Sequence, residues 1–186
     1  MEQRRLNSII LKCKDGDTEA FRLLVSEYQN MGFSLALKLL CSESEAEDAV
    51  QDAFVSVWHN IDRYSESKGK FTTWISTIVY RLCLDRIKHK KVNVSLPTDE
   101  AVLQEYVTAS DPEQQLMNSQ LAVIIKVLVS ELSPKQQIVF TLSVLDNMDT
   151  EEIEKITGLN ADKIKSNLYV ARQKIKKQLI RLGYDK

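Results

Sequence analysis

The segment from Asp149 to Arg172 carries the side chains whose types and spacing best suit a chemical task. A short apolar-periodic stretch ends at Gly158, and a basic amphipathic stretch follows it. Lysine and arginine bind phosphates and guanine edges, and asparagine suits adenine edges. The pattern predicts a helix-turn-helix whose second helix enters the major groove of DNA, the alternative being a helical hairpin with a solvated basic face. Its outward residues would be Lys163, Lys165, Ser166, Asn167, Tyr169 and Arg172.

Charge alternates in blocks along the chain, although 25 Lys and Arg residues nearly balance 26 Asp and Glu residues. Residues 81–91 carry a net charge of +4 and residues 163–186 carry +7. Residues 41–52 and 92–118 each carry −5. Any one block is typical of a solvated surface. Two basic blocks separated by an acidic spacer favour two anion-binding surfaces on two small domains.

The sequence offers little that an enzyme would need. His59 and His89 are the only histidines, and neither has a paired nucleophile nearby in the sequence. The only Gly-Lys pair, at 69–70, lacks a phosphate-binding loop. We therefore expect no catalytic site, no metal and no cofactor. The three cysteines are far apart and are interpreted as reduced packing residues, with a redox sensor as the alternative: Cys13, Cys41 and Cys83.

Composition bounds the fold class and the location of the 186-residue chain. Apolar residues make up 44%, and there are only 5 Gly and 3 Pro, which favours long helices around a sizeable core. No stretch reaches the roughly 18 apolar residues of a membrane span, and the N-terminal apolar patch lacks a cleavage site. The sequence therefore predicts an all-α protein without membrane insertion, located in the cytoplasm.

Apolar periodicity predicts four helices in the first half. Gly32 separates the first two, and Ser44 with Glu47 is expected to form a capping box at the start of the third. Residues 65–70 form a polar loop before the fourth. The predicted helices span 17–29, 33–41, 44–61 and 71–90.

The second half begins after a weakly periodic acidic stretch, which is interpreted as a linker with a short helix near Val102. Ser133, Pro134 and Gln136 predict a capped helix that ends near residue 145. Three further caps frame the helix-turn-helix: Asp149, Gly158 and Asn160.

Taken in order, these motifs resemble the extracytoplasmic-function (ECF) sigma factors, a small group within the bacterial sigma-70 family. The first half matches in Gly16-Asp17-x-x-Ala20-Phe21, in Ala46-Glu47-Asp48-Ala49-Val50-Gln51-Asp52-Ala53-Phe54-x-x-x-Trp58, in Phe71-x-x-Trp74-Ile75-x-x-Ile78 and in Asp85-x-x-Lys88. The second half matches in Leu132-Ser133-Pro134-Lys135-Gln136-Gln137, in Glu151-Glu152-Ile153, in Gly158-Leu159 and in Ile164-Lys165-Ser166-x-Leu168-x-x-Ala171-Arg172.

The resemblance implies two small helical domains joined by a flexible linker. Residues 1–91 would form a sigma region 2 bundle that binds core RNA polymerase and the −10 promoter element. Residues 92–115 would be the acidic linker. Residues 116–186 would form a sigma region 4 domain, whose helix-turn-helix binds the −35 element through the six outward residues named above.

The resemblance also assigns the polymerase contact to one face of the third predicted helix. Four residues at helical spacing remain on a face that the core does not need, and acids with an amide there suit basic and polar partner groups. In the family this face binds the clamp helices of the largest polymerase subunit. The residues are Asp48, Gln51, Asp52 and Val55. The alternative is a merely solvated acidic face.

Single-stranded −10 DNA needs stacking surfaces and cations near its backbone. The family uses the loop at 63–70 to hold a flipped base, whereas the spacing of Trp74 with Ile78 and Leu82 favours core packing for that tryptophan. The residues carried over to −10 and adjacent duplex contacts are Lys68, Lys70, Thr72, Thr73, Ser76, Tyr80, Arg81, Arg86, Lys88, Lys90 and Lys91.

The expected partners are core RNA polymerase, promoter DNA and an anti-sigma protein, and no catalysis of its own is implied. Several positions depart from the family pattern, so the base sequences of the promoter are not predicted: Arg81, Asn147, Lys155, Asn167 and Val170. The alternative function is a stand-alone two-domain helix-turn-helix regulator. Such a regulator would bind duplex DNA without polymerase and would give no role to the acidic face.

Overall fold

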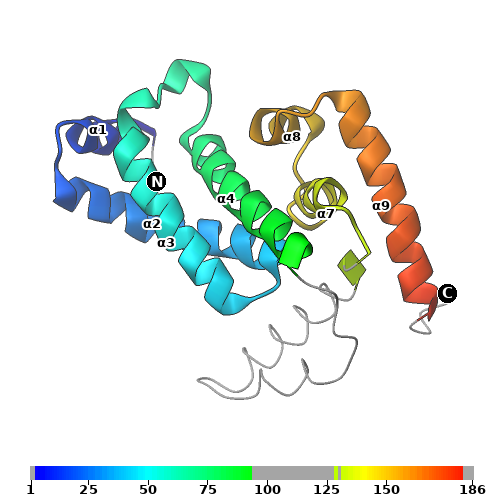
Figure 1. Cartoon of the computed structure of the whole chain (residues 1–186). Coiled ribbons are helices and arrows are strands. Elements are labelled where there is room, and N and C mark those ends of the chain that lie inside the picture. The colour runs from blue at the N-terminus through cyan, green and yellow to red at the C-terminus, as the bar shows by residue number, and fades with distance from the viewer. Residues whose placement is uncertain (1–2, 94–127, 130, 182–186) are drawn as a thin grey trace.

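The computed structural model describes residues 3–93, 128–129 and 131–181, apart from the side chains of residues 90–93. Every longer element in these ranges is helical, as predicted (Figure 1). None of the described helices is long and apolar enough to cross a bilayer. The elements of the first half are α1 (Gln3–Lys14), α2 (Thr18–Leu40), α3 (Glu43–Asn60), η1 (Ile61–Arg63), η2 (Glu66–Lys68) and α4 (Phe71–Asn93). Those of the second half are α7 (Pro134–Phe140), the π-helical turn η3 (Thr141–Leu145), α8 (Thr150–Thr157) and α9 (Ala161–Arg181).

The two helices predicted on either side of Gly32 are one continuous helix, α2, so the predicted break there is wrong. Gly32 is a buried position inside the helix, and a Cβ added to it would lie 3.7 Å from methyl groups of Val50 and Val79. These are ordinary van der Waals distances, so α3 and α4 leave room for one methyl group at this point of α2. Gly32 does not end the helix.

Replacing Gly32 by alanine is expected to stabilise the protein. The added methyl group meets ordinary van der Waals distances to Val50 and Val79, and alanine restricts the unfolded chain more than glycine does. Thermal unfolding should show that the free energy of unfolding rises by up to about 1 kcal/mol. Gly32→Leu is the matched test, because its larger side chain has no space there and should lower the unfolding temperature instead.

Two helix starts differ from the sequence prediction. The helix α3 begins at Glu43 with Ser42 as the residue before it, and no side chain caps it, so the predicted Ser44 capping box is absent. The reason is the left-handed turn at Cys41 (φ 51°), which leaves Ser42 extended and places Ser44 already inside the helix. The helix α1 was not predicted, although its buried residues follow helical spacing: Leu6, Ile9, Ile10 and Cys13.

Aromatic side chains pack against one another in the core of the first half, at the start of α4. Phe71 lies with its ring centroid 5.3 Å from that of Tyr28 and 5.0 Å from that of Tyr64, both in edge-on contact. Trp74 packs beside them, 5.5 Å from Tyr64 and 5.7 Å from Phe71. This arrangement agrees with the prediction that Trp74 packs in the core.

All three cysteines are buried and none of them forms a disulfide, which agrees with their interpretation as packing residues. Burial raises the pKa of Cys13 to about 11 and that of Cys83 to about 12. The thiolate is the reactive form of cysteine, and a raised pKa disfavours it at neutral pH. These two thiols are therefore poorly suited to redox sensing.

The start of the second half follows the prediction closely. Ser133 caps α7 in a complete capping box with Gln136, and Pro134 occupies the first turn. The helix then continues through η3 to Leu145, as predicted. The predicted linker and the short helix near Val102 lie outside the described residues.

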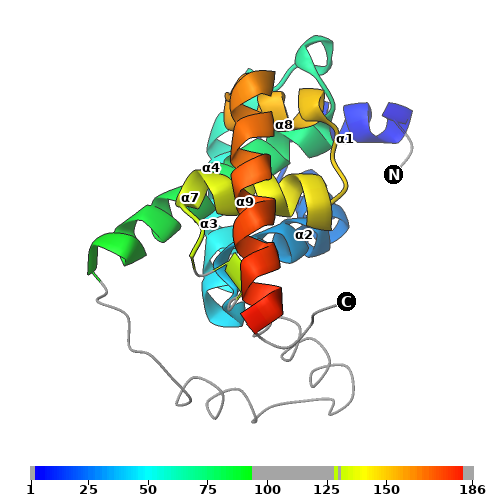
Figure 2. The same cartoon turned by 90° about the vertical axis from the view of Figure 1, so that its right-hand side faces the viewer.

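The two halves pack against each other (Figure 2). The helix α8 lies against α4, and one continuous buried cluster includes residues of α1 to α4 together with Ile138, Leu142 and Ile153. A smaller cluster joins Cys41 of the first half to Ala171 and other residues of the second half. The two sigma-like halves thus share a core in this conformation.

Candidate polymerase-binding and DNA-binding surfaces

The polymerase-contact residues predicted on α3 share one exposed face. Asp48, Gln51 and Asp52 are exposed, and Val55 is a large apolar side chain with 57% of its surface in contact with solvent. The opposite side of the helix is fully buried, at Ala46, Ala49, Ala53 and Val57. Since the core uses only that opposite side, the acidic face is available to a partner. We call Asp48, Gln51, Asp52 and Val55 the acidic face.

An apolar groove runs beside the acidic face, between α2 and α3, and was not predicted from the sequence. Its volume is about 590 Å³. Phe21 of α2 and Trp58 of α3 both line the groove, with ring centroids 4.9 Å apart. Gln51 and Val55 belong to both the groove and the acidic face. A partner that binds here can therefore combine a polar contact with an inserted apolar side chain.

An ion pair links the acidic face to the basic block of α4. The guanidinium of Arg86 binds the carboxylate of Asp52. Arg86 belongs to the predicted DNA contacts and Asp52 to the predicted polymerase contacts. Sequence reasoning placed the two residues on separate surfaces because 34 positions separate them.

The residues predicted to contact −10 DNA differ in how far their side chains are exposed. Lys68, Lys70, Thr72, Arg81 and Lys88 are exposed, and Thr73 and Arg86 are half-buried. The side chains of Lys90 and Lys91 lie outside the described residues.

Ser76 and Tyr80 are buried, with 4% and 5% of their surfaces exposed. Burial raises the pKa of the Tyr80 phenol. These two side chains are not accessible to DNA in this conformation.

The loop that precedes α4 is held by α1. Gln3 and Asn7 donate their side-chain amides to the two carboxylate oxygens of Glu66, at 3.0 and 2.7 Å. Lys14 donates to the carbonyl oxygen of Tyr64 at 2.8 Å. These contacts give α1 a function that was not predicted, which is to position the loop carrying Lys68.

The predicted helix-turn-helix is formed by α8 and α9. Asp149 accepts a hydrogen bond from the amide of Glu152 at 2.8 Å, and Asn160 accepts one from the amide of Lys163 at 3.0 Å. Gly158 ends α8 in the left-handed conformation (φ 70°). All three predicted caps are therefore correct.

The outer face of α9 presents most of the predicted −35 contacts. Five are exposed: Lys163, Lys165, Ser166, Tyr169 and Arg172. Asn167 is half-buried, and its amide donates to the carbonyl oxygen of Lys163 at 2.7 Å. To contact the edge of an adenine base, the Asn167 amide would have to give up its hydrogen bond to the Lys163 carbonyl oxygen. Figure 1 shows α9 on the side of the molecule opposite α1 and α2.

No group of three or more His, Cys, Asp or Glu residues within the described ranges is arranged to hold a metal ion. The chemistry that these surfaces offer is recognition: acids and an apolar groove on one half, and a basic helix on the other.

Two family models match the chain, one in each half, and their order along the chain is the predicted one. The model of sigma-70 region 2 matches residues 24–92, and the model of sigma-70 region 4 matches residues 122–175. Together they match 123 of the 186 residues. The chain belongs to the sigma-70 family. The resemblance seen in the sequence is thereby confirmed, and α3 and α4 fall in region 2 while α8 and α9 fall in region 4.

Relatives of this sigma factor span almost its full length. It is 29% identical over 177 residues to the ECF RNA polymerase sigma factor SigW of Bacillus subtilis, covering 91% of this chain and 94% of the relative. It is 25% identical over 185 residues to the ECF RNA polymerase sigma-E factor of Escherichia coli K12, covering 94% of each.

Two solved structures share the fold of this sigma factor. CnrH, solved in complex with the cytosolic domain of CnrY, has a TM-score of 0.64 at 20% identity, covering 98% of this chain and 99% of that one. The sigma factor RpoE of Bartonella quintana, solved with the anti-sigma factor NepR, has a TM-score of 0.60 at 19% identity, covering 86% and 96%.

Proposed function

We propose that this sigma factor, an initiation factor of the ECF type, directs core RNA polymerase to specific promoters in the cytoplasm, without catalysis of its own. The observation that carries the proposal is the pairing of two exposed surfaces on the two sigma-70 regions. Region 2 exposes an acidic face beside an apolar groove, and region 4 exposes a basic helix-turn-helix. One surface suits a basic protein partner and the other suits nucleic acid.

The roles follow the surfaces. The acidic face binds the clamp helices of the largest polymerase subunit, with the groove beside it receiving an apolar partner side chain. The exposed residues of the loop and of α4 contact the −10 region, and the outer face of α9 enters the major groove at the −35 element. Residues 1–91 and 116–186 act as separate domains, with 92–115 as the linker between them. An anti-sigma protein would regulate the factor by occupying these same surfaces.

The test is run-off transcription with purified core RNA polymerase and a library of promoter templates. The chain should give specific transcripts that core polymerase alone does not give. A stand-alone regulator would instead bind duplex promoter DNA without polymerase. Finding that behaviour, with neither core binding nor transcripts, would overturn the proposal.

A further inference from the structure

The helix α1 faces the loop before α4 with a stripe of polar side chains. Gln3, Asn7 and Lys14 are spaced i, i+4 and i+11, which places them on one side of a helix with 3.6 residues per turn. A neighbouring side of the same helix is buried in the core, at Leu6, Ile9, Ile10 and Cys13. The polar stripe therefore belongs to a helix that the core holds in place.

Gln3, Asn7 and Glu66 form a closed ring of three hydrogen bonds. The Gln3 amide nitrogen donates to the side-chain oxygen of Asn7 and to Glu66 Oε1, each at 3.0 Å. The Asn7 amide nitrogen donates to Glu66 Oε2 at 2.7 Å. Residue 66 must accept at both of its terminal atoms, which a carboxylate can do and an amide cannot. We call Gln3, Asn7 and Glu66 the polar triad.

The loop is also fixed where it begins and ends. The Lys14 ammonium donates to the carbonyl oxygen of Tyr64 at 2.8 Å. The Tyr64 hydroxyl donates across the loop to the carbonyl oxygen of Gly69 at 3.2 Å. Between these points, the amides of Lys68 and Gly69 donate to backbone carbonyl groups at 3.0 and 3.1 Å and form the turn η2. The polar triad and Lys14 thus hold a loop that has its own internal hydrogen bonds.

The part of the loop that α1 leaves free is basic. Lys68 and Lys70 are exposed on either side of Gly69. Cations near the backbone are what an unpaired DNA strand needs from a protein surface. A loop that is ordered before binding loses less conformational freedom on binding than one that its ligand must order. Contacts that order this loop therefore favour binding of the strand without touching it.

We propose that Gln3, Asn7 and Lys14 are positioning residues for promoter opening: through them α1 holds the loop at residues 63–70 in the shape that binds the unpaired strand of the −10 region. The inference rests on the proposed function, in which this loop contacts −10 DNA. The three residues act by fixing the loop, and the exposed lysines of the loop make the contacts.

Exchanging donors and acceptors tests the polar triad. In Glu66→Gln, however the three amides are turned, one of the three contacts joins two donors or two acceptors. Asn7→Asp sets two carboxylates against each other. The double variant Asn7→Asp/Glu66→Gln restores every hydrogen bond of the triad and keeps its net charge. Each single variant should therefore disturb the loop, and the double variant should not.

Hydrogen exchange of the η2 amides, followed by NMR in the full chain without polymerase, measures the order of the loop. Each single variant should raise the exchange rates of the Lys68 and Gly69 amides by about three- to tenfold. The double variant should return them to within about twofold of the parent rates. The melting temperature should change little in all three variants, because Gln3 and Glu66 are exposed. This separates loosening of the loop from loss of the fold.

Permanganate reactivity of unpaired thymines in the −10 region measures promoter opening by the holoenzyme, on a promoter found by run-off transcription. Glu66→Gln and Asn7→Asp should each lower the fraction of open promoter by about fivefold, which corresponds to the loss of one hydrogen bond. The double variant should restore opening. The affinity for core polymerase should be the same in all variants, because the triad lies outside the acidic face.

Lys14 is tested in the same two assays. Lys14→Met removes the donor to Tyr64 and should loosen the loop and lower opening, whereas Lys14→Arg keeps a donor and should restore most of both. Lys12→Met is the matched control on α1, because Lys12 is an exposed base of the same turn. It should change neither measurement.

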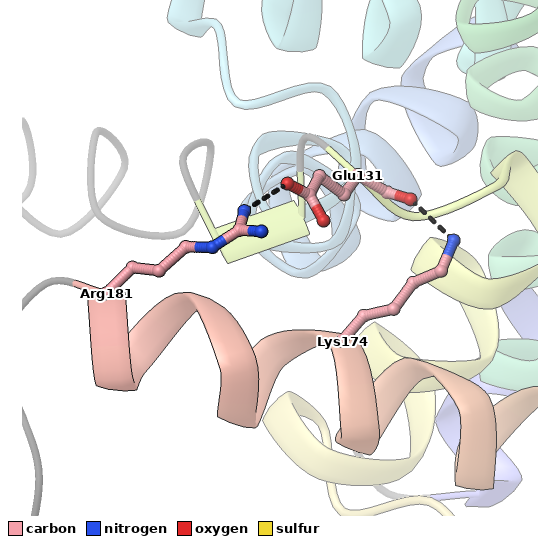
Figure 3. Close-up of polar contacts among 3 residues, drawn as sticks. All are labelled: Glu131, Lys174 and Arg181. Atoms are coloured by element: carbon pink, nitrogen blue, oxygen red, sulfur yellow. Dashed lines mark hydrogen bonds and ion pairs between the residues drawn. The ribbon is translucent and has the colours of Figure 1, made fainter.

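Glu131→Gln is the matched control for Glu66→Gln. Glu131 is likewise an exposed carboxylate that ties its segment to a helix, since it accepts from Arg181 of α9 at 2.9 Å (Figure 3). Lys174 donates to the main-chain carbonyl oxygen of Glu131 at 2.8 Å, and the substitution keeps this contact. The variant removes the same charge in the second half of the chain. It should leave η2 exchange unchanged and promoter opening within about twofold of the parent.

Unchanged η2 exchange in both single variants would overturn the positioning role of α1, and so would a double variant that behaves no better than the single ones. Faster exchange with unchanged promoter opening would overturn the link between the loop and −10 DNA. A parent chain that opens no promoter with core polymerase would reject the proposed function and the −10 part of the inference with it. The exchange rates would then still decide whether α1 holds the loop.

Discussion

Replacing Asp48, Gln51 and Asp52 together by alanine is expected to lower the affinity for core RNA polymerase by about two orders of magnitude, which is the effect of losing a cluster of interface hot spots. All three side chains are exposed, so their removal leaves the core of region 2 unchanged. The lost Asp52–Arg86 ion pair is a surface contact worth at most about 1 kcal/mol of stability. Fluorescence anisotropy of the labelled sigma factor, titrated with core polymerase, measures the change.

A matched triple variant separates recognition from overall charge. Glu151, Asp162 and Gln173 are likewise two exposed acids and one exposed amide, and they lie on region 4. Their replacement by alanine changes the net charge equally and should change core affinity by less than about threefold. Equal losses in the two triple variants would mean that long-range charge alone, rather than the acidic face, drives the association.

A substitution at the edge of the groove tests the same binding surface independently of the acidic side chains. Val55→Asp places a charge at the edge of the groove and should weaken core binding, whereas Leu11→Asp changes an equally exposed apolar residue of α1 and should not. An acidic substitution at Val55 that left core binding unchanged would place the partner elsewhere on α3.

Local signals in the sequence identified most of the helices correctly. The caps predicted at Ser133, Asp149, Gly158 and Asn160 are correct, whereas the predicted Ser44 capping box is absent. Gly32 was misread because the same residue type ends one helix and lies buried inside another. The neighbours that decide between these uses, Val50 and Val79, are 18 and 47 positions away.

Long-range contacts account for the remaining differences. The acidic face was predictable because exposure on one helix follows from periodicity. The groove beside it needed the position of α2 relative to α3, and the burial of Ser76 needed the position of α8 on α4. The tether from Gln3 and Asn7 to Glu66 joins residues about 60 positions apart. No local pattern encodes such pairs, so only the folded chain reveals them.

Replacing Lys165 and Arg172 together by alanine is expected to weaken binding of the holoenzyme to −35 duplex DNA, with no change in its affinity for core polymerase. The two residues are seven positions apart, which is two helical turns, and both are exposed on α9. If both contact phosphates, the slope of log affinity against log salt should fall by about 1.8, and the affinity should fall by one to two orders of magnitude at low salt. Filter binding of promoter fragments across a salt series measures both quantities.

The choice of control decides whether this loss belongs to the recognition helix. Arg4 and Arg5 are two exposed bases on α1, and their replacement by alanine removes the same charge. It should leave the salt slope within about 0.3 of the parent value, since no phosphate contact is lost. Asn167→Ala completes the series, because its amide is held by the Lys163 carbonyl group and carries no charge. A loss of affinity in this variant that depends on promoter sequence but not on salt would show that the amide gives up its hydrogen bond to Lys163 and reads a base edge. Unchanged affinity would restrict −35 recognition to the other five predicted residues, Lys163, Lys165, Ser166, Tyr169 and Arg172.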